Sequence, residues 1–120
     1  MIRTTRYRDI DAFTTRDGSI IRELMHPAQH GNVRQSLAEA TILIGAGTLL
    51  HKHRESEEIY YISGGSGSMV LAEETFDVAA GDTICIPAGS PHRITNTGTE
   101  PLTIICCCSP PYSDDDTVLL

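Results

Sequence analysis

With 120 residues, the chain is long enough for one domain with a hydrophobic core of its own. Hydrophobic residues make up 40% of it, as in ordinary globular domains, and no apolar run is long enough to span a bilayer. A formal net charge of −7 argues against binding to nucleic acid, which requires clustered lysine and arginine.

Short apolar segments separated by turn residues follow one another along the chain. We expect strands at residues 20–25, 37–44, 59–62, 68–71, 76–79, 83–86 and 102–108. Glycine, proline, asparagine and acidic residues occupy the intervals, and the only helix we expect is about one turn within the first fifteen residues. Many short strands at close spacing predict an all-β sandwich or barrel.

A single domain over residues 1–120 accounts for this pattern. We place the core barrel at about residues 17–109, with a separate N-terminal segment at 1–16. Residues 113–120 contain the run Asp114-Asp115-Asp116, and we expect them to form a solvated, poorly ordered acidic tail. The N-terminus lacks the apolar stretch of a signal peptide, which favours a cytoplasmic protein.

The four cysteines are arranged unlike a disulfide framework. Cys85 stands alone, whereas Cys106, Cys107 and Cys108 are consecutive. Adjacent residues on a strand point to opposite faces, so consecutive cysteines cannot pair without distortion. No pair has the CxxC spacing of a zinc clip. We therefore expect reduced thiols, as in a cytoplasmic protein.

Three histidines and a carboxylate predict a metal site. His51 and His53 are two residues apart, which on a strand puts both rings on one face, about 7 Å apart at the backbone. Two such rings can tilt onto one ion. His92 follows a tight turn at residues 87–91 that delivers a new strand against the earlier hairpin. Glu57 and Glu58 follow a polar triplet at residues 54–56 that reads as a turn.

These residues lie in two stretches that resemble the two motifs of the cupin superfamily. The first motif, G-x5-H-x-H-x3–4-E-x6-G, is matched by Gly45, His51, His53, Glu58 and Gly65. The second, G-x5-P-x-G-x2-H-x3-N, is matched by Gly81, Pro87, Gly89, His92 and Asn96. Glu57 also satisfies the permitted spacing. Glu58 is favoured because in similar sequences the ligand directly precedes the strand that begins here at Ile59.

The resemblance implies an antiparallel jelly-roll barrel (a double-stranded β-helix) with one divalent transition metal ion per chain. Its ligands would be His51, His53, Glu58 and His92, and the ion would be iron, manganese, nickel or zinc. Three neutral imidazoles and one carboxylate leave two adjacent octahedral positions open. Related small cupins often dimerise by exchanging N-terminal strands, so the resemblance also implies a homodimer, in which residues 1–8, with Ile2 and Tyr7, form the exchanged strand.

Several further residues are candidates for contact with a small-molecule substrate. Alternation along the strand sends Tyr60 and Ile62 to the same face as Glu58, and Tyr60 can donate a hydrogen bond to a bound ligand, although a core tyrosine is the commoner role. Other residues considered for the pocket are Met69, Arg22, Cys106 and Cys108.

Three classes of function fit this site. The first is a dioxygenase or oxidase that acts on a small organic molecule, with Tyr60 as the candidate catalytic residue. The second is a redox-neutral isomerase, decarboxylase or lyase acting on a sugar or hydroxy acid. Its auxiliary groups would come from Tyr60, His26, His30 and Arg22. The third is a non-catalytic cupin that binds a small ligand. The ligand set, together with the resemblance to cupin oxidases and dioxygenases, places the oxygen-dependent enzyme first.

Overall fold

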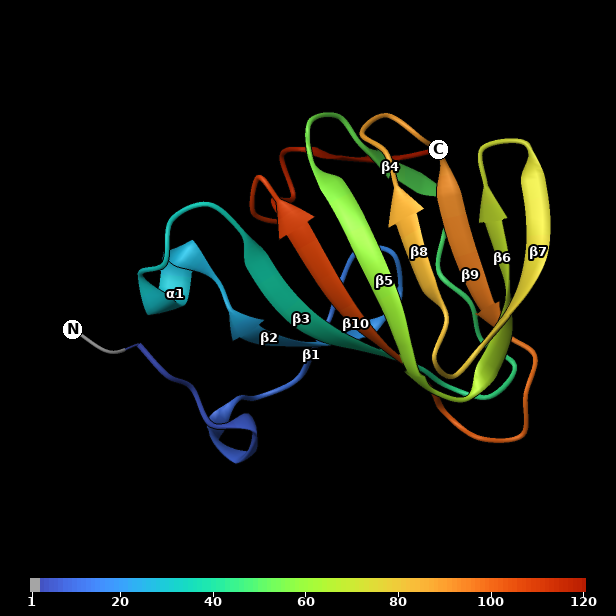
Figure 1. Ribbon diagram of the computed structural model, residues 1–120, viewed down its shortest axis with the longest axis horizontal. Helices are drawn as coiled ribbons and strands as arrows, with labels where there is room; N and C mark the ends of the chain where they lie inside the picture. Colours follow the sequence, from blue (N-terminus) through green and yellow to red (C-terminus); the bar gives the residue numbers. More distant parts are fainter. Residues whose placement is uncertain (1–2) are drawn as a thin grey trace.

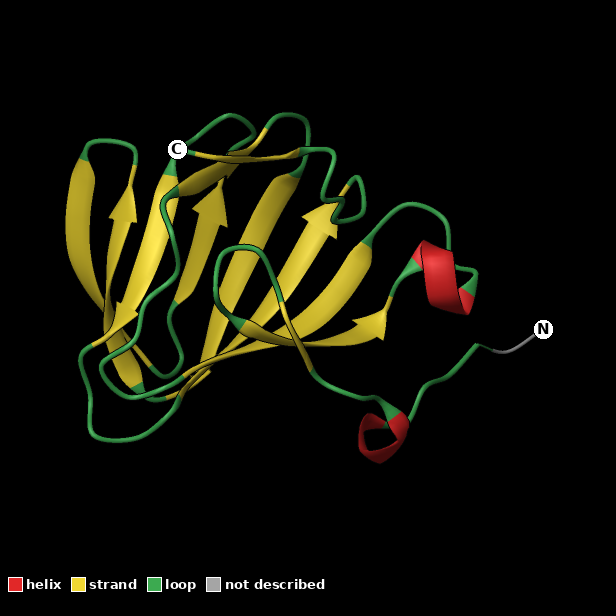
Figure 2. Cartoon of the chain, turned by 180° about the vertical axis from the view of Figure 1, so that it is seen from behind, coloured by secondary structure: helices red, strands yellow, loops and turns green. Residues whose placement is uncertain are grey.

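The computed structural model describes residues 3–120, which form two antiparallel β-sheets packed face to face (Figures 1 and 2). The first sheet contains, in spatial order, β1 (Phe13–Thr14), β2 (Ile20–Met25), β3 (Ser36–Ile42), β10 (Leu102–Ser109), β5 (Glu57–Gly64) and β8 (Thr83–Ile86). The second contains β11 (Thr117–Leu119), β4 (His51–His53), β9 (His92–Asn96), β6 (Ser66–Leu71) and β7 (Glu74–Ala79). The predicted all-β jelly roll is confirmed.

Helical structure is confined to two single turns among the described residues. They are the 3-10 helix η1 (Tyr7–Asp9), within the first fifteen residues where a turn is expected, and α1 (Pro27–His30), where no helix is expected. No helix of the described chain is both long and apolar enough to cross a membrane.

Side chains alternate between the core and the outer surface along the central strands. On β5, every second residue from Glu58 is buried, so Tyr60 and Ile62 point inward as predicted. The register of β10 with β5 pairs Cys108 with Glu58 and Cys106 with Tyr60, which places both cysteines on the inner face. This parity brings Glu58, the two cysteines and Tyr60 to one inner surface.

The turn that leads into β9 is built for a glycine. Gly89 has a φ of 80°, a left-handed conformation that a β-carbon would penalise. Its N–H donates to the carbonyl oxygen of His53 at 2.7 Å, so the turn is attached to β4. His92, the first residue of β9, therefore starts its strand beside the strand that carries His51 and His53.

Asn96 lies at the far end of β9 and ties that end to neighbouring segments. Its side-chain amide donates to the carbonyl oxygens of Ile42 and Glu100 at 3.0 and 2.8 Å, and its Oδ1 accepts from the N–H of Gly98. The side chain is buried with its donors and its acceptor in use, which ties β9 to the end of β3.

The C-terminal residues differ from the poorly ordered tail expected from their charge. Residues Thr117–Leu119 form β11, which pairs antiparallel with β4 in the register Thr117–His53 and Leu119–His51. Asp116 accepts hydrogen bonds from the backbone N–H groups of Glu55 and Ser56, so an acidic side chain caps the turn between β4 and β5. The expectation was wrong because it weighed local charge and missed this long-range pairing.

The N-terminal segment runs away from the two sheets before β1 (Figure 1). Within this chain β1 pairs with its neighbour β2, with Phe13 opposite Ile21. The Tyr7 hydroxyl donates to a carboxylate oxygen of Glu39 at 2.6 Å, and the Arg22 guanidinium lies 4.8 Å from the centre of the Tyr7 ring. Ile2, named in the strand-exchange prediction, lies outside the described residues.

Candidate metal centre

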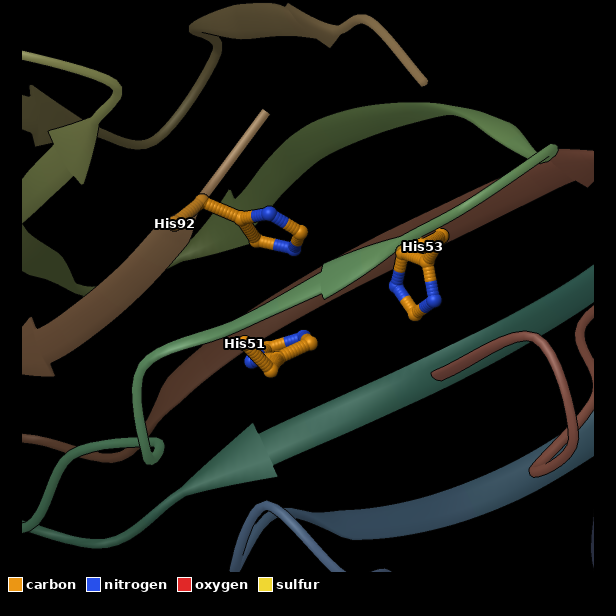
Figure 3. A group of neighbouring side chains, drawn as sticks. All are labelled: His51, His53 and His92. Atoms are coloured by element: carbon orange, nitrogen blue, oxygen red, sulfur yellow. The ribbon is translucent and has the colours of Figure 1, made fainter. Parts of the chain in front are cut away.

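The three histidines predicted to bind metal converge at the inner face of the second sheet. His51 and His53 project to the same side of β4, and His92 approaches from β9 (Figure 3). Their ring centroids are 4.2 Å apart for His51 and His92, 5.2 Å for His51 and His53, and 5.4 Å for His53 and His92. One nitrogen from each ring lies within 4.8 Å of the other two, and all three side chains are buried.

The Nδ1 atom of each histidine has a hydrogen-bond acceptor. His51 Nδ1 lies 2.7 Å from the carbonyl oxygen of Leu49, and His92 Nδ1 lies 3.0 Å from that of Ser90. Because a carbonyl oxygen only accepts, both Nδ1 atoms carry the proton in these contacts. The Nε2 atom of a neutral ring is then left with a free lone pair, as metal binding requires.

His53 reaches the same state through a hydroxyl group. Its Nδ1 lies 3.0 Å from Thr117 Oγ1, and that hydroxyl donates its own proton to the carbonyl oxygen of Ser113 at 2.9 Å. Thr117 therefore accepts from His53, and Nδ1 of His53 is the protonated nitrogen. The C-terminal segment thus orients one of the three histidines.

Glu58, and not Glu57, faces the histidines. Its Oε1 lies 3.3 Å from His53 Nε2 and 3.5 Å from His92 Nε2, and the residue is 5% exposed. Glu57, one position earlier on β5, is exposed. The side chain therefore follows the parity of the strand, and the turn before β5 supplies the bend that brings it opposite β4.

These contacts leave two buried polar atoms without a hydrogen-bond partner, Glu58 Oε1 and His92 Nε2. With Nδ1 protonated, Nε2 is an acceptor and so is the carboxylate oxygen, and two acceptors at this distance repel each other unless a cation lies between them. Unsatisfied buried polar atoms are rare in native structures. The four donor groups therefore fit a divalent transition metal ion, which prefers imidazole and carboxylate ligands of this kind.

The charges of the donor groups agree with this reading. Burial lowers the pKa of His51, and the neighbouring His92 lowers it further, which favours the neutral ring. Burial alone would raise the pKa of Glu58, but positive charge at the positions of His53 and His92 brings it down to about 2. With both rings neutral, a bound cation between them supplies the positive charge that keeps the carboxyl group ionised.

Cys108 supports the carboxylate from behind. Its thiol lies 3.2 Å from Glu58 Oε2, the oxygen that faces away from the histidines, and donates to it. Burial and the charge of Glu58 raise the pKa of the Cys108 thiol, so it keeps its proton and remains a donor. The hydrogen bond leaves Oε1 as the oxygen that faces His53 and His92.

A cavity of about 50 Å³ opens onto the centre. Its wall includes His51, His53 and Glu58, together with Tyr60, Cys106 and Cys108 from the predicted pocket. Ile62 and Met69 are fully buried in the core, and Arg22 lies on the outer face near Tyr7; none of these three lines the cavity.

Three residues of this region were not singled out from the sequence. Asp17 Oδ2 lies 3.6 Å from His51 Nε2, Glu23 lines the cavity, and Thr117 orients His53. Asp17 lies in a turn and Thr117 in a segment expected to be a tail, so the local sequence pattern does not indicate that either lies near the site. Glu23 did have one, because alternation on β2 places it on the same side as Ile21, whereas Arg22 points outward.

The comparisons with known proteins agree with the fold and the motifs. The model of the cupin domain matches residues 38–108. The chain is 56% identical over 116 residues to the uncharacterized protein MJ1618 of Methanocaldococcus jannaschii, covering 97% of this chain and 93% of that protein.

Two solved structures show the same architecture. The polyketide cyclase RemF from Streptomyces resistomycificus superposes with a TM-score of 0.78 at 25% identity, covering 97% of this chain and 89% of RemF. Oxalate decarboxylase from Bacillus subtilis gives a TM-score of 0.85 at 21% identity, with 99% of this chain aligned to 32% of that longer chain. Together with the matched domain model, these likenesses show that the chain belongs to the cupin family.

Proposed function

We propose that this protein is a metal-dependent cupin enzyme that oxidises a small organic molecule with dioxygen. His51, His53, His92 and Glu58 would hold one divalent ion per chain, with iron(II) expected. The observation that carries the metal site is the pair of opposed, unpartnered acceptor atoms, Glu58 Oε1 and His92 Nε2, which a cation would satisfy. The choice of an oxygen-dependent reaction rests on the set of three histidines and one glutamate. When bound, such an ion supplies a Lewis acid with open positions for dioxygen and substrate.

A tyrosine and a cysteine of the cavity wall suit a site that binds a small molecule and dioxygen. Burial, together with the charge of Glu58, raises the pKa of Tyr60 well above its usual value, so Tyr60 keeps its proton and can donate a hydrogen bond to a bound molecule. Burial raises the pKa of the Cys106 thiol in the same way. Since the thiolate is the reactive form, protonated thiols can line an oxygen-exposed cavity without rapid oxidation.

Oxygen consumption tests the reaction class. The iron(II)-loaded protein is assayed in an oxygen electrode with small diketones, phenols and organic acids, and the His92→Ala variant serves as the control. We expect uptake above background that the variant lacks. Equal uptake by both proteins, or none with any compound, would count against the oxygen-dependent reaction.

A redox-neutral reaction is the second candidate. It is favoured by the 25% identity to RemF, a protein described as a polyketide cyclase, since ring closure of that kind needs no oxidant. Conversion of a substrate under anaerobic conditions, with zinc, nickel or manganese in the site, would support this alternative. Binding of a small ligand without turnover under either condition would leave the non-catalytic function.

We also propose that the chain forms a homodimer in a reducing compartment. β1 lies at the edge of the first sheet, where another chain can add, and the outer face of that sheet exposes Leu37, Ile59 and Tyr61. The four cysteines are free thiols, as is usual for cytoplasmic proteins.

A further inference from the structure

Glu23 is a carboxylate buried inside the first sheet, away from the four proposed metal ligands. It lies on β2 and is 7% exposed. Its Oε1 is buried without a hydrogen-bond partner, and the residue lines the cavity that leads to the metal centre. Burial raises the pKa of Glu23, because the charged form of an unpaired buried carboxyl group is costly. A bound cation or hydrogen-bond donor would offset that cost and satisfy Oε1.

His26, whose charge acts on Glu23, is already engaged by other groups. Both ring nitrogens of His26 are used, because Nδ1 accepts from the N–H of Ala28 at 3.0 Å and Nε2 donates to the carbonyl oxygen of Tyr112 at 2.8 Å. No lysine or arginine stands among the described residues that line the cavity. The chain therefore offers Glu23 Oε1 no donor, and a bound molecule that carries one would satisfy it.

Small side chains open the space between Glu23 and the centre. Across the inner face, the strand register places Glu23 opposite Ala38, Ala38 opposite Cys106, and Cys106 opposite Tyr60. Because the side chains of Ala38 and Cys106 are small, they leave space above the sheet in the middle of this row. The resulting cavity of about 50 Å³ has room for roughly three to five water-sized groups, at the volume that a single buried water needs.

A second carboxylate, Asp17, lines the cavity next to the metal centre. Asp17 Oδ1 accepts from the N–H and the hydroxyl of Ser19 at 3.0 and 2.7 Å, so the side chain is held in place. Its Oδ2 points toward His51 Nε2 at 3.6 Å. Glu58 neutralises part of the charge of a bound divalent ion, and Asp17 and Glu23 then make the rest of the wall acidic.

We propose that the cavity binds a small molecule that carries an ammonium or hydroxyl donor at the end facing Glu23, with its other end at the metal centre. The inference rests on the proposed metal site and narrows its substrate class. Amino alcohols, polyols and similar donor-bearing compounds satisfy Glu23. A molecule that presents a carboxylate at this end would face the carboxyl group of Glu23 without a cation to balance the two charges.

Three hydroxamates that share one metal-binding head and differ in the tail test this inference. Glycine hydroxamate carries an ammonium tail, acetohydroxamate a methyl tail, and malonic monohydroxamate a carboxylate tail. Each is titrated into the cobalt(II)-loaded protein while the visible absorption of the metal is recorded. We expect glycine hydroxamate to bind at least about ten-fold more tightly than acetohydroxamate, because a buried carboxylate gains a charged hydrogen-bond partner. Malonic monohydroxamate is expected to bind most weakly.

The Glu23→Gln variant keeps the size of the side chain and removes its charge. We expect it to lose most of the preference for the ammonium tail, whereas Glu57→Gln, which removes an exposed carboxylate on β5, keeps it. Equal affinity of the wild type for the ammonium and methyl tails, or tightest binding of the carboxylate tail, would overturn the inference while leaving the metal site standing. A protein that binds no cobalt would overturn the metal site and the inference together.

Discussion

Each proposed ligand of the metal is oriented by a neighbour that does not itself face the metal. The carbonyl oxygens of Leu49 and Ser90 hold His51 and His92, Thr117 holds His53, and the Cys108 thiol holds the outer oxygen of Glu58. Such outer contacts set the ring tautomer and the carboxylate orientation, and losing one typically costs about 10- to 100-fold in metal affinity.

Substitution of Cys108 tests whether such an outer contact affects the affinity for the metal. Cys108→Ala removes the thiol that donates to Glu58 Oε2, so we expect metal affinity to fall about ten-fold, whereas Cys108→Ser keeps a donor and loses less. Competition with a chromophoric chelator measures both affinities, and Cys85→Ala, at an exposed cysteine, is the control. Wild-type affinity in the alanine variant would show that the thiol does not position the ligand.

At the scale of single elements, β11 links the C-terminus to the metal centre. Thr117→Val keeps the shape of the side chain but leaves Nδ1 of His53 without its acceptor. We expect metal affinity to fall by about ten-fold or more, and Thr117→Ser, which keeps the hydroxyl, to restore most of it. The two variants are compared by isothermal titration with zinc. Identical affinities for the valine and serine variants would mean that the hydroxyl does not orient His53.

The turn between β4 and β5 depends on Asp116. Asp116→Ala removes the acceptor of the Glu55 and Ser56 N–H groups, and we expect a loss of about 1 kcal/mol in the free energy of unfolding at neutral pH. Burial alone would raise the pKa of Asp116, but the hydrogen bonds from Ser56 and Glu55 lower it below the ordinary value of 3.8.

Because the folded-state pKa of Asp116 is depressed, its contribution to stability is complete above the unfolded-state value of 3.8 and disappears as the pH falls through the folded-state value. The difference in the free energy of unfolding between the wild type and Asp116→Ala therefore becomes smaller in acid. Urea unfolding at neutral pH and at a pH below 3.8 measures this difference. The control is Asp115→Ala, which changes an exposed aspartate of the same run. A difference that is unchanged or larger in acid would contradict the assigned capping role.

The same elements show what could be predicted from the sequence. Apolar segments between turn residues predict the strands at residues 20–25 and 83–86. The resemblance to the cupin motif favours Glu58 over Glu57, and alternation from Glu58 then predicts the inward direction of Tyr60. β11 could not be predicted, since residues 110–116 carry prolines and aspartates and the strand exists only through pairing with β4. Arg22 is one of the residues predicted to line the pocket, yet on β2 it is Glu23 that lines the cavity.

At the scale of the whole molecule, the open edge at β1 and the apolar outer face argue for self-association. Leu37, Ile59 and Tyr61 are 37%, 42% and 46% exposed on that face. We expect light scattering to give twice the chain mass of 13.0 kDa at micromolar concentration. A mass equal to one chain across that range would rule out the homodimer.

The metal content of the purified protein tests the central claim most directly. The protein is prepared without added metal or chelator under low oxygen, analysed for transition metals, and compared with Glu58→Gln and Glu57→Gln. We predict about one divalent transition metal ion per chain in the wild type, a sharp loss in Glu58→Gln and wild-type content in Glu57→Gln, because only Glu58 faces the histidines. A wild-type protein that holds no metal even after reconstitution, or a loss confined to Glu57→Gln, would contradict the proposed centre.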